Sequence, residues 1–156
     1  MTSKRREQLM EKISLEVRRS QSRTDAYDEA VATALGLNRT DFRCLDILST
    51  EGTLTAGRLA ELMGLTSGAM TSVLDRLESV GYARRVRDTE DRRRVHVELT
   101  PKMHETAWPY YQPLAEMSAK LYARFSDEQL ELLLDFLESA AELFDGEFAR
   151  LREQLA

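Results

Sequence analysis

The spacing of apolar and polar residues is helical over most of the chain. In its first half we expect four helices, over residues 5–35, 39–49, 56–63 and 67–80. Gly36, Gly64 and Gly81 follow the first, third and fourth of these segments, where the left-handed end of a helix favours glycine. Asn38 and Thr55 stand at capping positions before the second and third helices. These signals predict helices joined by short turns.

After Gly81 the apolar period changes to two, which is typical of strands. We expect two strands over residues 83–87 and 95–99, joined by a charged hairpin, and a short third strand at residues 53–54. In the second strand, valine and leucine alternate with His96 and Glu98, as a sheet with one face on a core requires.

Two helices are expected after the strands. Thr100 can cap a long one, with Pro101 at its first position, where the missing N–H costs nothing. Ser126 and Gln129 have capping-box spacing at the start of the last helix. Its apolar stripe consists of Leu130, Leu133, Leu134, Leu137, Ala141, Phe144, Phe148, Leu151 and Leu155.

The third and fourth helices have the pattern of a helix-turn-helix, whose second helix enters the major groove in proteins of that type. Ala60 lets the two helices cross closely, and Gly64 supplies the turn. Helical spacing predicts a buried stripe of Met70, Val73, Leu74 and Leu77 on the second helix. It leaves a small, polar outer face of Gly68, Thr71, Ser72, Asp75 and Arg76. The alternative is an αα-hairpin within a helical core.

An arginine-rich hairpin follows and favours DNA binding. Residues 82–94 hold six arginines and three acidic residues, a net charge of +3. Arginines at the tip suit a narrow minor groove, and those on the strands can pair with phosphates. The alternative is a solvated charged hairpin.

Over nearly its full length the chain resembles the MarR family of winged-helix transcription regulators. The resemblance rests on four segments: Leu62-Met-Gly-Leu-Thr66, Leu74-Asp-Arg-Leu-Glu78, Val80-Gly-Tyr-Ala-Arg84, and the wing from Asp88-Thr-Glu-Asp-Arg-Arg93 to Val97-Glu-Leu-Thr100. It implies a mainly α fold with a small β-hairpin wing, residues 38–100 forming the winged helix-turn-helix and residues 1–37 and 101–156 a helical dimerisation region. It also implies a homodimer that commonly represses transcription until a small, often phenolic, effector releases the DNA.

The resemblance and the exposed charges together predict the contact residues. For DNA these are Thr66, Ser67, Gly68, Ala69, Thr71, Ser72, Arg76, Arg84, Arg85, Arg87, Asp91, Arg92 and Arg93. Within this set, the resemblance implies that Arg93 enters the minor groove and that Asp91 orients the Arg93 side chain. The implied effector-binding residues are Tyr27, Phe42, His104, Trp108 and Tyr111, for which plain core packing is the alternative. Because Ser72 stands where many relatives have arginine, we expect a different operator sequence.

The charge of the chain is unevenly distributed. The 156 residues carry 22 basic and 27 acidic side chains, which argues against sequence-blind coating of nucleic acid. Residues 1–24 carry a net charge of +4, whereas residues 126–156 carry −7. We therefore expect the last helix to face away from DNA and, with the first helix, to form the dimer interface.

Other chemistries find little support in the sequence. Cys44 lies among apolar helix positions and is expected to be an inert buried thiol. We expect no metal site, cofactor or catalytic centre, because the two histidines are isolated and no phosphate loop or nucleophile motif is visible. A cytoplasmic protein is expected, since no apolar run reaches bilayer length. The alternative function is a winged-helix module whose arginine hairpin grips an acidic protein partner.

Overall fold

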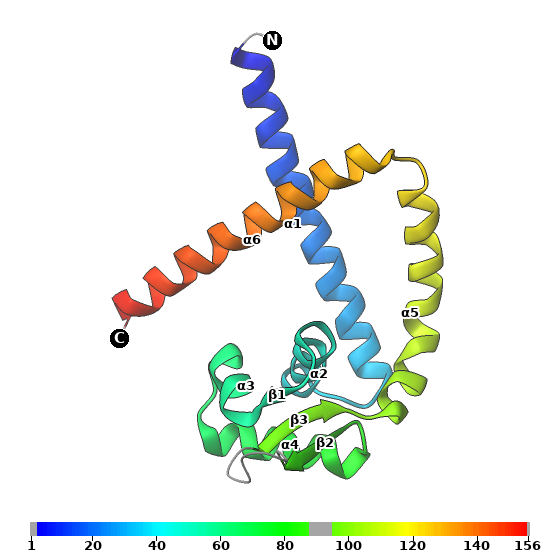
Figure 1. The fold of residues 1–156 in the computed structure, drawn as a ribbon, viewed down its shortest axis with the longest axis vertical. Helices are drawn as coiled ribbons and strands as arrows, with labels where there is room; N and C mark the ends of the chain where they lie inside the picture. Colours follow the sequence, from blue (N-terminus) through cyan, green and yellow to red (C-terminus); the bar gives the residue numbers. More distant parts are fainter. Residues whose placement is uncertain (1–2, 88–94, 156) are drawn as a thin grey trace. The chain divides into compact units, whose positions relative to one another are not determined.

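The computed structural model describes residues 3–87 and 95–155. These residues form six helices and three short strands, which Figure 1 labels along the chain. The chain divides into two compact units, Met1–Tyr110 and Tyr111–Ala156. The predicted fold class, mainly helical with a small β wing, is confirmed.

The first unit holds most of the elements. They are α1 (Ser3–Ala34), α2 (Arg39–Glu51), β1 (Leu54–Thr55), α3 (Ala56–Met63), α4 (Ser67–Val80), β2 (Ala83–Arg87), β3 (Val95–Leu99) and the start of α5 (Pro101–Tyr122). The two long strands have the predicted bounds, and the short third strand lies one residue later than predicted.

The sheet is antiparallel, with β3 in the middle and β1 and β2 on either side. Ala83 pairs with Leu99 and Arg87 with Val95, so the two long strands are in full register. Leu54 on β1 pairs with Val97, whose side chain is completely buried. The sheet thus closes one side of the helical core.

Helix α4 lies at the centre of this core and contacts α2, α3 and β2. The largest fully buried side chains come from α2, α3, α4 and β3: Cys44, Leu45, Leu59, Met70, Leu74, Leu77 and Val97. Apolar burial of this kind is the main stabilising contribution in a small domain.

The predicted helix ends are confirmed by their hydrogen bonds. Thr55 Oγ1 accepts from the Arg58 amide at 3.2 Å and caps α3. Thr66 Oγ1 accepts from the Ala69 amide at 3.3 Å and caps α4. Gly64 ends α3 with a φ of 65°, which only glycine adopts without strain. These caps fix where the helix-turn-helix begins and ends.

The second unit contains the rest of α5 and helix α6 (Asp127–Leu155). The predicted capping box opens α6: the Ser126 amide donates to Gln129 Oε1 at 3.0 Å, and the Gln129 amide donates to Ser126 Oγ at 3.4 Å. None of the described residues of α6 is buried. In the part of the chain that the structure describes, we find no helix long and apolar enough to cross a membrane.

Candidate DNA interface

The recognition helix α4 presents the outer face that its sequence predicts. Met70, Val73, Leu74 and Leu77 are all buried toward the core. The opposite face is exposed and consists of Gly68, Ala69, Thr71, Ser72, Asp75 and Arg76, with Thr66 and Ser67 at its start. Small side chains leave room for a helix to lie deep in a groove.

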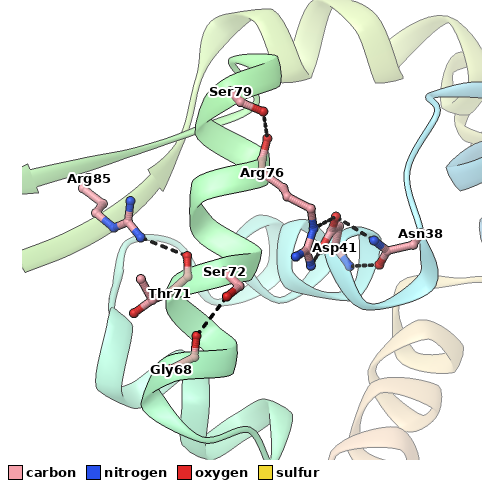
Figure 2. A network of polar contacts seen from close by, with 8 residues as sticks. All are labelled: Asn38, Asp41, Gly68, Thr71, Ser72, Arg76, Ser79 and Arg85. Atoms are coloured by element: carbon pink, nitrogen blue, oxygen red, sulfur yellow. Dashed lines mark hydrogen bonds and ion pairs between the residues drawn. The ribbon is translucent and has the colours of Figure 1, made fainter.

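Two hydroxyl groups on this face are oriented by the helix itself. Thr71 Oγ1 donates to the Ser67 carbonyl at 2.9 Å. Ser72 Oγ donates to the Gly68 carbonyl at 3.2 Å, as Figure 2 shows. Each oxygen can still accept a hydrogen bond, for example from an amino group of adenine or cytosine. These two hydroxyl groups are therefore held in defined orientations.

Arg76 reaches sideways from α4 to α2, where it binds Asp41 (Figure 2). Arg76 Nε donates to Asp41 Oδ2 at 2.9 Å, and Nη2 donates to Oδ1 at 2.6 Å. The side chain of Arg76 is 49% exposed, whereas that of Asp41 is only 4% exposed. The hydrogen bonds with Asp41 raise the pKa of Arg76. This arginine, predicted to contact DNA, is part of an internal ion pair.

Asp41 is the functional candidate that the sequence reading missed. Its carboxylate also accepts from Asn38 Nδ2 at 2.8 Å, so three donors satisfy it. The sequence does hold a signal for its burial: Asp41 lies three, four and seven residues before Cys44, Leu45 and Leu48, and so belongs to the same buried stripe of α2. A carboxylate in an apolar stripe indicates a buried ionic partner.

Arg85 on β2 contacts α4 on the side opposite to Arg76 (Figure 2). Its guanidinium forms ion pairs with Asp75, at 2.8 Å, and with Glu78, and it donates to the Thr71 carbonyl at 3.2 Å. Burial lowers the pKa of Arg85, but the hydrogen bonds and charges of Asp75 and Glu78 outweigh it and raise the pKa overall. Arg85 thus ties the wing to the recognition helix.

The other two wing arginines that the structure describes, Arg84 and Arg87, are exposed. Arg84 pairs with Glu98 across the sheet at 2.5 Å, and its side chain is 62% exposed. Arg87 is exposed at the end of β2. Asp91, Arg92 and Arg93, predicted for the wing tip, lie outside the described residues.

The predicted effector residues are spread over several elements. The Tyr27 hydroxyl on α1 donates to the Tyr110 carbonyl on α5. Trp108 and His104 on α5 are exposed, and Tyr111 begins the second unit. Phe42 lines a cleft of about 950 Å³ between α1 and α2, and none of the other predicted effector residues lines that cleft.

The cleft is more polar than the predicted aromatic cluster. Its lining includes the carboxylates Asp25, Asp28, Glu29 and Asp46 and the guanidinium groups of Arg39 and Arg43. Burial, and then the charge of Asp28, raise the pKa of Asp46. The chemistry of this lining suits a ligand with polar or cationic groups beside an aromatic ring.

Cys44 is fully buried on the side of α2 that packs in the core. Burial, with the charge of Asp41 as a smaller cause, raises the pKa of its thiol to about 12. The thiol is therefore protonated at neutral pH, as expected of an unreactive cysteine.

Two helices joined by a tight turn, the second with an exposed outer face and followed by two paired strands, define a winged helix-turn-helix DNA-binding fold. The model of the MarR family matches residues 37–95. The HTH-type transcriptional regulator YcgE of Bacillus subtilis is 36% identical over 145 residues, which cover 92% of this chain and 94% of the relative. The chain belongs to the MarR family and is a transcriptional regulator with a DNA-binding winged helix.

Solved structures agree with this assignment. The transcriptional regulator BldR of Sulfolobus solfataricus is 28% identical, with coverage of 91% of this chain and 99% of that one and a TM-score of 0.53. A mutant of MepR from S. aureus, solved bound to an oligodeoxyribonucleotide, is 19% identical, with coverage of 85% and 97% and a TM-score of 0.54. At that identity, the second likeness shows the fold alone.

Proposed function

We propose that the protein acts as a homodimeric repressor that binds a near-palindromic operator and is released by a small aromatic or phenolic effector. The observation that carries this proposal is the outer face of α4, which is small, polar and exposed while the rest of the helix is locked into the core. Thr66, Ser67, Gly68, Ala69, Thr71 and Ser72 would meet base edges and nearby phosphates. The oligonucleotide bound to MepR, a protein of the same fold, supports this use.

In this proposal the wing supplies charge around the groove. Arg84 and Arg87 would pair with phosphates, Arg92 and Arg93 would approach the minor groove, and Asp91 would orient Arg93. Arg84 pairs with Glu98, but its side chain is 62% exposed and can still reach a phosphate. Arg76 and Arg85 would act from within the protein, because Arg76 binds the buried Asp41 and Arg85, only 27% exposed, binds both Asp75 and Glu78.

A second copy of the chain is the proposed partner of the terminal helices, within segments 1–37 and 101–156. Helix α6 exposes Leu134, Leu137, Phe144 and Phe148, and the first half of α1 exposes several large apolar side chains as well. Apolar surface on this scale is typical of a protein interface. The net charges of +4 on residues 1–24 and −7 on residues 126–156 are complementary between copies.

The cleft between α1 and α2 is the proposed place for the effector. Phe42 and Arg43 on one face of α2 line it, while Asp41 on the same helix binds the recognition helix through Arg76. A ligand that displaced α2 would therefore act directly on α4.

The proposed function is tested by measuring binding of the purified chain to the DNA upstream of its own coding sequence over a range of salt concentrations. We expect tight binding that weakens steeply with salt, because each phosphate contact contributes a slope of about −0.9 in log K against log salt. Replacing Arg87 with alanine should weaken binding and make the slope shallower by about 1.8, because the dimer carries the substitution twice and loses two phosphate contacts. DNA binding that is absent or indifferent to sequence would favour the alternative, a module that grips an acidic protein.

The same assay tests the effector. Aromatic acids and aromatic amines are added to the preformed complex, and we expect at least one class to release the DNA. Replacing Phe42 with alanine should raise the concentration needed about tenfold, the effect of losing one aromatic contact of roughly 1.4 kcal/mol. An unchanged release concentration in that variant would remove the α1–α2 cleft from the proposal.

A further inference from the structure

We propose that Asp41 is a positioning residue for operator recognition, which acts by holding the guanidinium of Arg76 and so fixing how α4 is rotated in the groove. The inference rests on the proposed operator binding. In this proposal Asp41 and Arg76 together orient α4, and Arg76 does not contact a phosphate itself.

The geometry of the Arg76–Asp41 pair fixes the relative orientation of the two side-chain groups as well as the distance between them. Two parallel hydrogen bonds, at 2.9 and 2.6 Å, join the planar guanidinium to the planar carboxylate. Such a two-pronged contact restricts rotation of both groups, which a single ammonium contact does not. On the other side of the carboxylate, Asn38 donates to Oδ2 at 2.8 Å and accepts from the Asp41 amide at 2.9 Å. Asp41 is therefore anchored to the start of α2.

Apolar packing in the core is one part of what orients α4, and polar contacts add directional control. Helix α4 packs inward through the apolar side chains Met70, Val73, Leu74 and Leu77, and apolar attraction is non-directional. The polar bonds from α4 side chains to neighbouring elements are made by Arg76 toward α2, and by Asp75 and Glu78 toward Arg85 of β2. Figure 2 shows Arg76 and Arg85 on opposite sides of the helix. We infer that the two arginines brace α4 from both sides.

Arg76 cannot leave Asp41 for a phosphate at low cost. The Asp41 side chain is 4% exposed, so departure of the arginine would leave a buried carboxylate with Asn38 as its one side-chain donor among the described residues. Leaving a buried carboxylate without its cationic partner is unfavourable, although the exposed side of Arg76 makes this pair only partly buried. The pair is therefore expected to persist in the DNA complex.

The test is a double-mutant cycle on the full chain. The operator is first located by nuclease footprinting of the upstream DNA, and the affinity of each variant is then measured for a fluorescent fragment that carries it and for a scrambled fragment. The variants are Asp41→Asn, Arg76→Gln and the two combined, with Glu51→Gln, the same carboxylate-to-amide change at the exposed end of α2, as control. We expect each single variant to lose about tenfold in operator affinity and less than threefold on scrambled DNA. The double variant should be no weaker than the weaker single, since both remove one shared contact.

Two further measurements distinguish a positioning role of Arg76 from a direct contact between its charge and a DNA phosphate. The slope of log K against log salt should stay unchanged in Arg76→Gln, whereas loss of one phosphate contact in each copy of the dimer would make it shallower by about 1.8. Arg76→Lys keeps the charge but not the two-pronged geometry, so it should bind the operator about as poorly as Arg76→Gln. Thermal melts followed by circular dichroism identify a temperature at which the variants are folded, and binding is measured there. If Asp41→Asn does not fold, the two Arg76 variants still distinguish a positioning role from a phosphate contact.

The inference is overturned if Asp41→Asn binds the operator within twofold of the unsubstituted protein, or if Arg76→Lys restores affinity while Arg76→Gln lowers the salt slope. If the unsubstituted protein itself does not prefer the operator over scrambled DNA, the proposed function fails first and this inference fails with it.

Discussion

Replacing Gly68 with glutamate is expected to lower operator affinity at least about 100-fold while leaving the protein folded. Gly68 lies exposed in the first turn of α4, and a Cβ atom built there meets no heavy atom within 4 Å. A glutamate in the first turn stabilises the helix, because its negative charge interacts favourably with the positive end of the helix dipole. On DNA the same side chain would occupy the groove and repel phosphates, and 100-fold corresponds to roughly 2.7 kcal/mol.

The adjacent helix provides a matched control. Gly57 is the second residue of α3, as Gly68 is of α4, and it likewise has open space at its Cβ position. Gly57→Glu should change operator affinity less than about fivefold. Equal losses in the two variants would show that α4 has no special role at the groove, and a melting temperature lowered in Gly68→Glu would show that this glycine serves the fold instead.

Replacing Leu77 with alanine is expected to have the largest effect on stability. Leu77 is completely buried on α4, within the set of fully buried side chains that includes Leu59 and Val97. Truncating a buried leucine costs about 2–5 kcal/mol, depending on how far the cavity collapses. That is a large fraction of the roughly 5–15 kcal/mol that stabilises a typical domain. Thermal melts at fixed protein concentration should show the midpoint lowered by roughly 5–15 °C.

Val80 at the end of the same helix serves as the control for this change. Its side chain is 40% exposed, so Val80→Ala removes little buried surface and should shift stability by less than about 0.5 kcal/mol. A Leu77→Ala protein as stable as Val80→Ala would contradict a core centred on α4.

The helix-turn-helix was predictable from sequence because its signals are local. The spacing of Met70, Val73, Leu74 and Leu77 determines the buried side of α4, and all four are buried. Gly64 and Gly81 mark helix ends by their left-handed conformation, a property of single residues. Strand bounds followed from period-two alternation in the same way.

The ion-pair partners of Arg76 and Arg85 were not predictable from local pattern. Exposure and charge suggested DNA contacts for Arg76 and Arg85, yet Arg76 binds a carboxylate 35 residues earlier in the chain. Such a pair depends on how α2 crosses α4, which neither helix encodes alone. The lining of the α1–α2 cleft likewise follows from how the two helices pack against each other. Of the five residues that the resemblance suggests for an effector, Phe42 alone lines this cleft.

The central claim is that two copies of this chain place two α4 helices on one symmetric operator. It is tested most directly by nuclease footprinting of the upstream DNA, combined with the mass of the complex from light scattering. We predict protection of one near-palindrome, with half-sites about 10 base pairs apart, and a complex of two 17.9 kDa chains per operator. One chain per DNA fragment, or protection of a single asymmetric half-site, would contradict the claim.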